Sequence, residues 1–340
     1  MSLTPSASFI LGNFRYDSHA AAIVASLALL PGVNSFRVML PVSAQLDAEL
    51  GENASLNLDG GEGSEIVLTG KIDSIQRRFQ TAEIVAVDGA SQLAAFRPAA
   101  TYEKQAAKEV IRGLASEASV DVGNIDLDVP LAAYVAHQWR TAAEHIAYLA
   151  TLAGAVARIE PNGQLTVAVP SGTADMALLY GRELSEARVR RRRMPAVQRF
   201  AIGSGPAGST NAPDALRQTT SRLPSDAAPP GTSAVWDVNH VLRVPSAAVS
   251  ASSAAVTAFA RKATTITSHC FLLPKLRPGM VIEIQQLPKG LSGGPWMLTH
   301  VEHRLSPTTG GATSFEGVSV GESGLGGMVG TLASAVGGLL

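Results

Sequence analysis

A pattern of strand-like segments occurs once near each end of the chain and constrains its fold more than any other feature. Residues 65–87 (EIVLTGKIDSIQRRFQTAEIVAV) combine two apolar runs with an alternating segment and a short polar turn, and residues 296–320 repeat this order. A glycine, Gly51 or Gly279, stands just before a further strand-like segment upstream of each copy. Runs rich in β-branched residues, bounded by Gly and Pro and joined by short turns, are typical of antiparallel meanders. Two such meanders predict a duplicated β-barrel or sandwich.

The bulk properties indicate a multidomain protein that buries surface against other chains. A length of 340 residues allows two or three domains, and a net charge of -1 offers no overall field for nucleic acid or an anionic membrane. Charged residues are 16% of the chain, below the roughly 25% of ordinary soluble domains. A single cysteine, Cys270, excludes an internal disulfide framework and is compatible with assembly in a reducing cytoplasm.

Two apolar segments need an explanation other than membrane insertion. Residues 20–30 (AAAIVASLALL) have the length of a signal-peptide core, but Pro31-Gly32-Val33 follows in place of a small-residue cleavage site. We therefore predict a buried helix there and no signal peptide. Residues 321–340 are rich in glycine, which makes them a poor membrane span and favours a segment that becomes ordered against a partner.

The chain divides into a first β unit, a different middle module, a second β unit and a tail. The first unit covers residues 1–96, and its elements besides the meander are strands at 8–17 and 35–40 and short helices at 43–50 and 90–96. The second unit covers residues 186–320, with a long loop at 203–231, strands at 238–244 and 266–272, and a helix at 248–264. The fold class is mainly β (α+β), with a small module inserted between two antiparallel units.

The inserted module, residues 97–185, shows helical signals followed by a hairpin. Thr101 begins a predicted helix with apolar residues on one face. Thr141 and Glu144 form a capping box at the start of a second helix. Strand-like residues on either side of Asn162-Gly163 predict a β-hairpin.

The arginines between residues 188 and 199 are the one notable cluster of charge. If residues 187–193 form a strand, Arg188, Arg190 and Arg192 line one face of it. They could contact a polyanion or an acidic neighbouring subunit, or they could belong to an edge strand that charge protects from aggregation. A protein partner is favoured over DNA because no aromatic residues lie between the arginines to stack on bases.

No motif for catalysis, a metal or a cofactor stands out. The pair His300 and His303 would diverge on a strand, so we predict a surface or interface role for His303 rather than metal binding. His269 and Cys270 are adjacent and would face opposite sides of a strand, which excludes a thiol beside its base. We predict no catalytic residues, no metal, no cofactor and no enzymatic activity.

Several phrases of the sequence resemble a known family. They are LTGKIDSI with IVAVDG, then TAAEHIAYLATLAGAVARIEPNGQLTV, and last LRPGMVIEI leading to WMLTHVEHRL. In this order they resemble baseplate hub proteins of contractile-tailed bacteriophages and related contractile injection systems, including the late-control-D type, over most of residues 8–320. The resemblance implies two β-barrels related to the tail-tube fold. It also implies a homotrimer whose six barrels form a quasi-sixfold ring between a hexameric tail tube and a trimeric central spike.

The same resemblance implies partners and a location. Besides itself, the chain would contact the tube protein, the spike protein and other baseplate or tape-measure proteins, within a virion or particle baseplate assembled in the bacterial cytoplasm. DNA or a protein cargo could pass through the lumen, with Arg188, Arg190 and Arg192 as lumen or inter-subunit contacts. The tail would contact a separate spike through its apolar residues, which are Leu325, Met328, Leu332, Leu339 and Leu340.

Three alternatives remain open at this stage. A tail-tip cell-wall hydrolase would need paired acids or a metal in a cleft. A receptor- or polysaccharide-binding tail protein would expose aromatic side chains, yet aromatics are 5% of this chain. A nucleic-acid-binding protein would rest on the arginine cluster alone.

Overall fold

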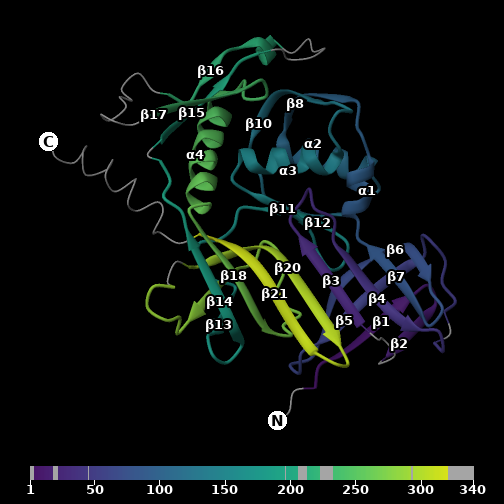
Figure 1. Ribbon diagram of the computed structural model, residues 1–340. Coiled ribbons are helices and arrows are strands. Elements are labelled where there is room, and N and C mark those ends of the chain that lie inside the picture. Colours follow the sequence, from purple (N-terminus) through teal and green to yellow (C-terminus); the bar gives the residue numbers. More distant parts are fainter. Residues whose placement is uncertain are drawn as a thin grey trace.

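A β layer and a helical layer make up the molecule. The computed structural model describes residues 4–17, 22–44, 46–195, 197–205, 213–222, 233–291 and 294–320. Figure 1 shows the β layer below and the helices α1, α2 and α3 above it, with α4 beside them. The expected fold class, mainly β with an inserted helical and hairpin module, is confirmed.

Strands from both β units form one sheet of 13 strands. From the first unit these strands are β1 (Ser6–Leu11), β2 (Phe14–Asp17), β3 (Ala22–Ala28), β4 (Ser35–Pro41), β5 (Asn53–Asp59), β6 (Ser64–Arg77) and β7 (Thr81–Val87). From the second half they are β13 (Met176–Leu179), β14 (Leu184–Arg191), β18 (Thr264–Phe271), β19 (Val281–Gln285), β20 (Trp296–Ser306) and β21 (Gly310–Ser319). The units meet where β3 pairs antiparallel with β20.

The order of neighbouring strands is the same in the two units. In the first unit the order is β3-β4-β7-β6-β5, and in the second it is β14-β18-β21-β20-β19. Each unit therefore has a long strand in the corresponding position, β6 or β20, at the centre of its meander. This shared order shows that the pattern repeated in the sequence is repeated in the fold.

Hydrogen bonds fix which residues of the two copies correspond. The backbone N–H of Gly51 donates to the carbonyl of Ile72 (2.8 Å), and that of Gly279 donates to the carbonyl of Leu298 (2.7 Å). Both glycines have a positive φ, 84° and 85°, that other residues rarely adopt. The pairing register then shifts directly after Ile72 in β6 and directly after Leu298 in β20. Ile72 thus corresponds to Leu298, and the residues that follow correspond one by one.

The helix predicted for residues 20–30 is wrong. Most of the described part of this segment is β3 (Ala22–Ala28), in which buried Ile23, Ala25 and Leu27 alternate with less buried residues. A short run of consecutive apolar residues suits a buried helix or a buried strand equally well. Pairing with β4 on one side and β20 on the other settles the choice, and neither partner could be read from local sequence.

The helix predicted for residues 43–50 is also wrong, because the described residues of this range contain no helix. A helix of this length is marginal without packing, and the capping-box position holds Leu46 rather than an acid. The nearby Glu52 does not cap a helix; its carboxylate accepts a hydrogen bond from the N–H of Glu49 (2.9 Å). The segment is an irregular link between β4 and β5.

The inserted module largely follows its sequence signals. Its elements are β8 (Ala100–Ala106), α2 (Ala107–Glu117), β9 (Val122–Ile125), β10 (Pro130–Ala136), α3 (Ala142–Leu152), β11 (Val156–Ile159) and β12 (Leu165–Ala168). The helix α1 (Ala90–Ala95), predicted as the end of the first unit, shares their hydrophobic core. The capping box is confirmed, since the Thr141 N–H donates to the Glu144 carboxylate (2.7 Å) and the Glu144 N–H donates to the Thr141 hydroxyl (3.2 Å). The helix expected from Thr101 begins only at Ala107, because β8 pairs with β10 first.

A part of the second half packs on the inserted module rather than in the large sheet. It comprises β15 (Val197–Gly203), the turn of helix Pro213–Leu216, β16 (Thr219–Thr220), β17 (Ser233–Asn239) and α4 (Pro245–Arg261). Buried side chains of α4 and the preceding loop share a hydrophobic core with α2 and α3. The strand predicted at 238–244 is thus shifted to β17, and the range 203–231 contains short elements. The division of the chain into four ranges stays a prediction.

Candidate assembly interface

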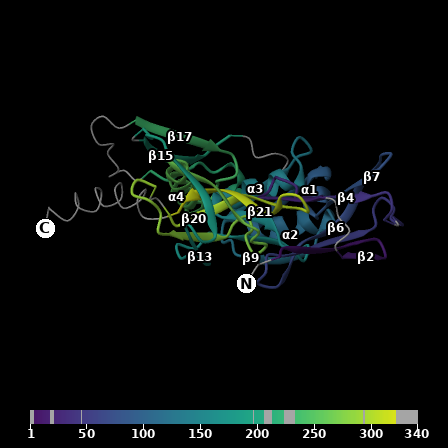
Figure 2. The same cartoon turned by 60° about the horizontal axis from the view of Figure 1, so that its bottom comes forward.

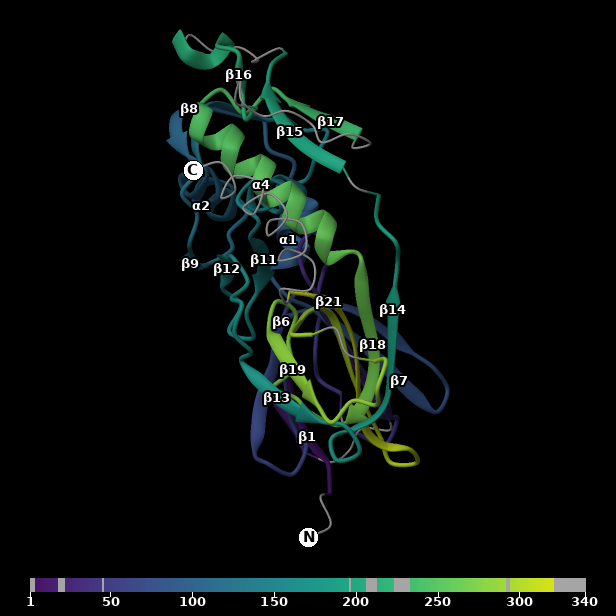
Figure 3. The same cartoon turned by 90° about the vertical axis from the view of Figure 1, so that its left-hand side faces the viewer.

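The predicted arginine face lies at one end of the large sheet, on strand β14. β14 pairs only with β18 among the described strands, so its other edge carries no strand. Figure 3 shows β14 running along the margin of the sheet beside β18. Arg188 and Arg190 lie two residues apart on this strand and are exposed, whereas Arg192 follows just after its last residue, Arg191. A row of charge on an edge strand opposes nonspecific pairing.

The backbone of β14 alternates between its partner strand and the open edge. The N–H of Arg192 donates to the carbonyl of Ala263 (2.7 Å), on the side of β18. Successive residues of an antiparallel strand point their backbone groups in opposite directions. The backbone groups of Arg190 and Arg188 therefore also face β18, and those of Val189 and Ala187 face outward.

A second open edge lies at the far end of β6, and sequence reasoning missed it. β5 pairs with β6 as far as Lys71, and the residues just before β5 bond to Ile72, so residues 73–77 run past this neighbour. The N–H of Arg78 donates to the carbonyl of Thr81 (2.7 Å) on the side of β7, which leaves the backbone groups of Arg77 and Ile75 facing outward. Phe79, in the turn that follows, is 95% exposed. That single aromatic in a polar turn is the only local signal of this edge.

His303 lies in the seam between the two β units and is not a surface residue. Its side chain is fully buried (0% exposed), and its Nδ1 is 2.9 Å from the hydroxyl of Thr313 on β21. Burial lowers the pKa of His303 to about 4, so the ring is neutral at pH 7. The predicted surface or interface role is wrong, because Ala25 of β3 lies directly opposite and closes the site.

The side chains of His269 and Cys270 point to opposite sides of β18, as expected. Cys270 is buried while His269 is exposed. Burial also raises the pKa of the Cys270 thiol to about 12, so no thiolate is available as a nucleophile. Within the described ranges there is no cluster of three or more potential metal-ligating side chains.

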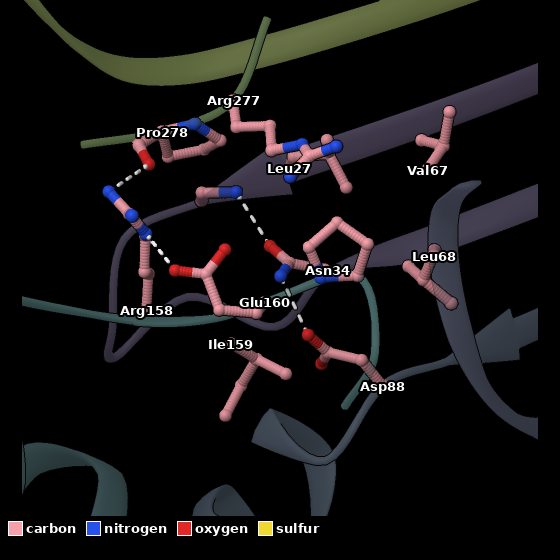
Figure 4. A pocket seen from close by; sticks show the side chains of 12 residues that line it. Leu27, Asn34, Val67, Leu68, Asp88, Arg158, Ile159, Glu160, Arg277 and Pro278 are labelled. Atoms are coloured by element: carbon pink, nitrogen blue, oxygen red, sulfur yellow. Dashed lines mark hydrogen bonds and ion pairs between the residues drawn. The ribbon is translucent and has the colours of Figure 1, made fainter. Parts of the chain in front are cut away.

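A buried polar contact holds the start of α1 against the ends of strands of the first β unit (Figure 4). The amide Nδ2 of Asn34 donates to Oδ2 of Asp88 (2.6 Å), and the N–H of Ala90 at the start of α1 donates to Oδ1 (3.0 Å). Oδ1 of Asn34 accepts from the N–H of Ala28 at the end of β3 (2.7 Å). The adjoining cavity holds only about 10 Å³, room for about one water molecule. The contact is structural, with no space for a ligand.

Asp88 should make the stability of the fold pH-dependent. Burial raises its pKa from 3.8 to about 6. The folded protein therefore binds a proton that the unfolded chain has lost, and this stabilisation disappears as the pH rises from about 4 to above 6. We expect the free energy of unfolding of the wild type, relative to Asp88→Asn, to fall by up to about 3 kcal/mol across that window. Urea unfolding at several pH values measures this, and parallel curves for the two proteins would contradict it.

The predicted spike contacts lie outside the described residues. These are Leu325, Met328, Leu332, Leu339 and Leu340. Among the helices of the described ranges, none combines the length and apolarity needed to cross a bilayer.

Comparison with solved structures identifies the fold. Neither a sequence profile of a known family nor a curated protein sequence matches the chain. The 43 kDa tail protein of prophage MuSo2 from Shewanella oneidensis superposes with a TM-score of 0.67 at 13% identity, over 93% of this chain and 98% of that one. The chain has the fold of phage tail proteins. A tail protein from Neisseria meningitidis MC58 also gives a TM-score of 0.67, at 15% identity over 93% of this chain and 97% of that one.

The tail-protein fold extends to secretion systems. An E. coli component of the type VI secretion system, described as structurally similar to tail proteins of bacteriophage T4, gives a TM-score of 0.58 at 11% identity. That match covers 89% of this chain and 74% of the other. Because the matches cover nearly the whole chain, both β units and the module between them belong to the tail-protein fold.

Proposed function

We propose that the chain is a structural protein of a phage tail or a related injection system, and that it forms the baseplate hub. Three copies assemble into a ring that joins the hexameric tail tube to the trimeric central spike. The observation that carries this proposal is the repeated strand order of the two β units, with their matched glycines and register shifts. The similarity to tail proteins supports it independently.

The duplication supplies a physical reason for a trimer. A ring with threefold symmetry presents six similar units only if each chain carries two of them. One face can then match a sixfold tube, and the other can match a threefold spike. Obligate assemblies of this kind bury more than about 2,000 Å² at each interface, so they need extended contact surfaces such as strand edges.

Under this proposal the work of the protein is mechanical rather than catalytic. Arg188, Arg190 and Arg192 serve at contacts between subunits. The partners are other copies of the chain, the tube protein, the spike protein and further baseplate or tape-measure proteins, and DNA or a protein cargo passes through the ring.

The mass of the purified protein in solution tests this proposal. We expect three times the 35.2 kDa of a single chain by light scattering after size exclusion, and rings with six similar lobes by negative-stain microscopy. The reason is the closed threefold symmetry given above. A protein that remains a monomer at every concentration up to about 100 μM would contradict the proposal, because an obligate ring persists far below that concentration.

A further inference from the structure

The seam inside the chain shows how one β unit joins the next. β3 of the first unit pairs antiparallel with the second half of β20, with Ile23 opposite Leu305 and Ala25 opposite His303. The first half of β20 pairs with β19 instead, and the change of partner occurs beside Leu298. The seam thus involves the part of β20 that extends beyond its pairing with β19.

Each side of this seam has a counterpart elsewhere in the chain. Ile72 of β6 corresponds to Leu298 of β20, so Arg77 corresponds to His303. In the first unit β3 pairs with β4 and β4 pairs with β7; in the second, β14 pairs with β18 and β18 pairs with β21. Following these pairings outward from the corresponding residues of β7 and β21 places Val189 of β14 at the position of Ala25 in β3.

The seam partners are paired, whereas neither counterpart has a strand partner at that edge among the described residues. No described strand pairs with β6 beyond Lys71 on the side of β5, and none pairs with the outer edge of β14. The backbone groups of Arg77 and Val189 therefore correspond to the two sides of the seam. Both face outward, and neither pairs with another strand in the described chain. Figure 1 shows these edges at opposite ends of the β layer, and Figure 2 shows the same separation with β6 and β7 at one end and β13 and β20 toward the other.

We propose that β14 of one copy pairs antiparallel with the far end of β6 in a second copy, in the register of the β3–β20 seam. This pairing places Val189 opposite Arg77 and Arg190 opposite Gln76 of the second copy. It rests on the proposed hub function, and it assigns the surface through which subunits of that ring contact one another. The two edges are different surfaces of one molecule, so the contact is head-to-tail, and a head-to-tail contact of suitable angle closes into a ring.

This register fixes which side chains of the two edges lie opposite one another. On the side that continues the core, Val189 lies opposite Arg77, and Ala187 lies opposite Phe79, which is 95% exposed in the single chain. On the other side, Arg190 lies opposite Gln76, whose partner on β7 is Glu83, and Arg188 lies opposite Arg78. Backbone pairing adds the seam's ladder of hydrogen bonds, and the charged side chains limit pairing with other strands.

A disulfide between copies tests the register directly. Arg190 and Gln76 would form a non-hydrogen-bonded pair with Cα atoms about 4.5 Å apart, within the roughly 4.4–6.8 Å that a disulfide spans. We expect the full-length double variant Gln76→Cys with Arg190→Cys to form covalent dimers and closed trimers under oxidation on a non-reducing gel. The buried Cys270 should not interfere, and each single variant should stay monomeric on that gel.

A matched double variant controls for chance collisions. Gln76→Cys with Glu186→Cys keeps one cysteine and moves the other four residues along β14, about 13 Å away, so little cross-linking is expected. A protein that is trimeric by mass but does not cross-link through the in-register pair, or that cross-links equally through the control pair, overturns this inference and leaves the proposed hub intact. A protein that is monomeric by mass and does not cross-link contradicts both.

Discussion

Replacing Trp296 with alanine should lower the free energy of unfolding by about 3–5 kcal/mol, the range for truncating a fully buried aromatic side chain. Trp296 is 0% exposed and is the largest fully buried side chain in the described ranges. It begins β20, opposite Ile282 of β19 and Ser319 of β21. Its loss leaves a cavity where three strands of the second β unit meet, and chemical denaturation at fixed protein concentration measures the effect.

Trp139 offers a matched control for that measurement. It is 83% exposed, so Trp139→Ala makes the same chemical change with almost no loss of packing. A surface substitution of this kind changes stability by within about 0.5 kcal/mol. Similar losses for the two variants would show that Trp296 does not anchor the second β unit.

The meanders and the capped helix were predictable because their signals are local. Alternating burial in β7 and the capping box at Thr141 each depend on residues within a few positions of one another. β3 was not predictable, since its identity as a strand depends on β20, which lies far away in the sequence. His303 was misplaced for the same reason, because the strand that buries it comes from the other β unit.

The candidate interface was only half visible in the sequence. The arginines of β14 are conspicuous as a cluster, and their strand placement follows from alternation. The open end of β6 has no comparable signal, since Ile75 and Arg77 resemble residues of any exposed strand. The open end of β6 is recognised as an interface only because it corresponds to β20. That correspondence is established by the hydrogen bonds of Gly51 and Gly279, which the sequence does not show.

Proline at position 77 should weaken the ring while leaving the single chain folded. The N–H of Arg77 faces the open edge of β6, and proline is tolerated in a strand where the missing N–H faces solvent. In the proposed ring this N–H donates to the β14 strand of the next copy, opposite Val189. Losing that bond and crowding the partner strand should weaken each contact at least about tenfold, the effect of about 1.4 kcal/mol. Light scattering measures the mass, and far-UV circular dichroism reports on the fold.

Proline at position 76, one residue away, should destabilise the fold of the single chain rather than the contact between subunits. The N–H of Gln76 faces β7, so Gln76→Pro removes a hydrogen bond inside the chain and leaves a carbonyl of β7 unsatisfied. Such a loss costs about 1–3 kcal/mol of folding stability. The two variants therefore separate assembly from folding: Arg77→Pro should change the mass, and Gln76→Pro should lower the midpoint of unfolding of the monomer. A trimer that survives Arg77→Pro unchanged would show that β6 does not take part in the contact between subunits.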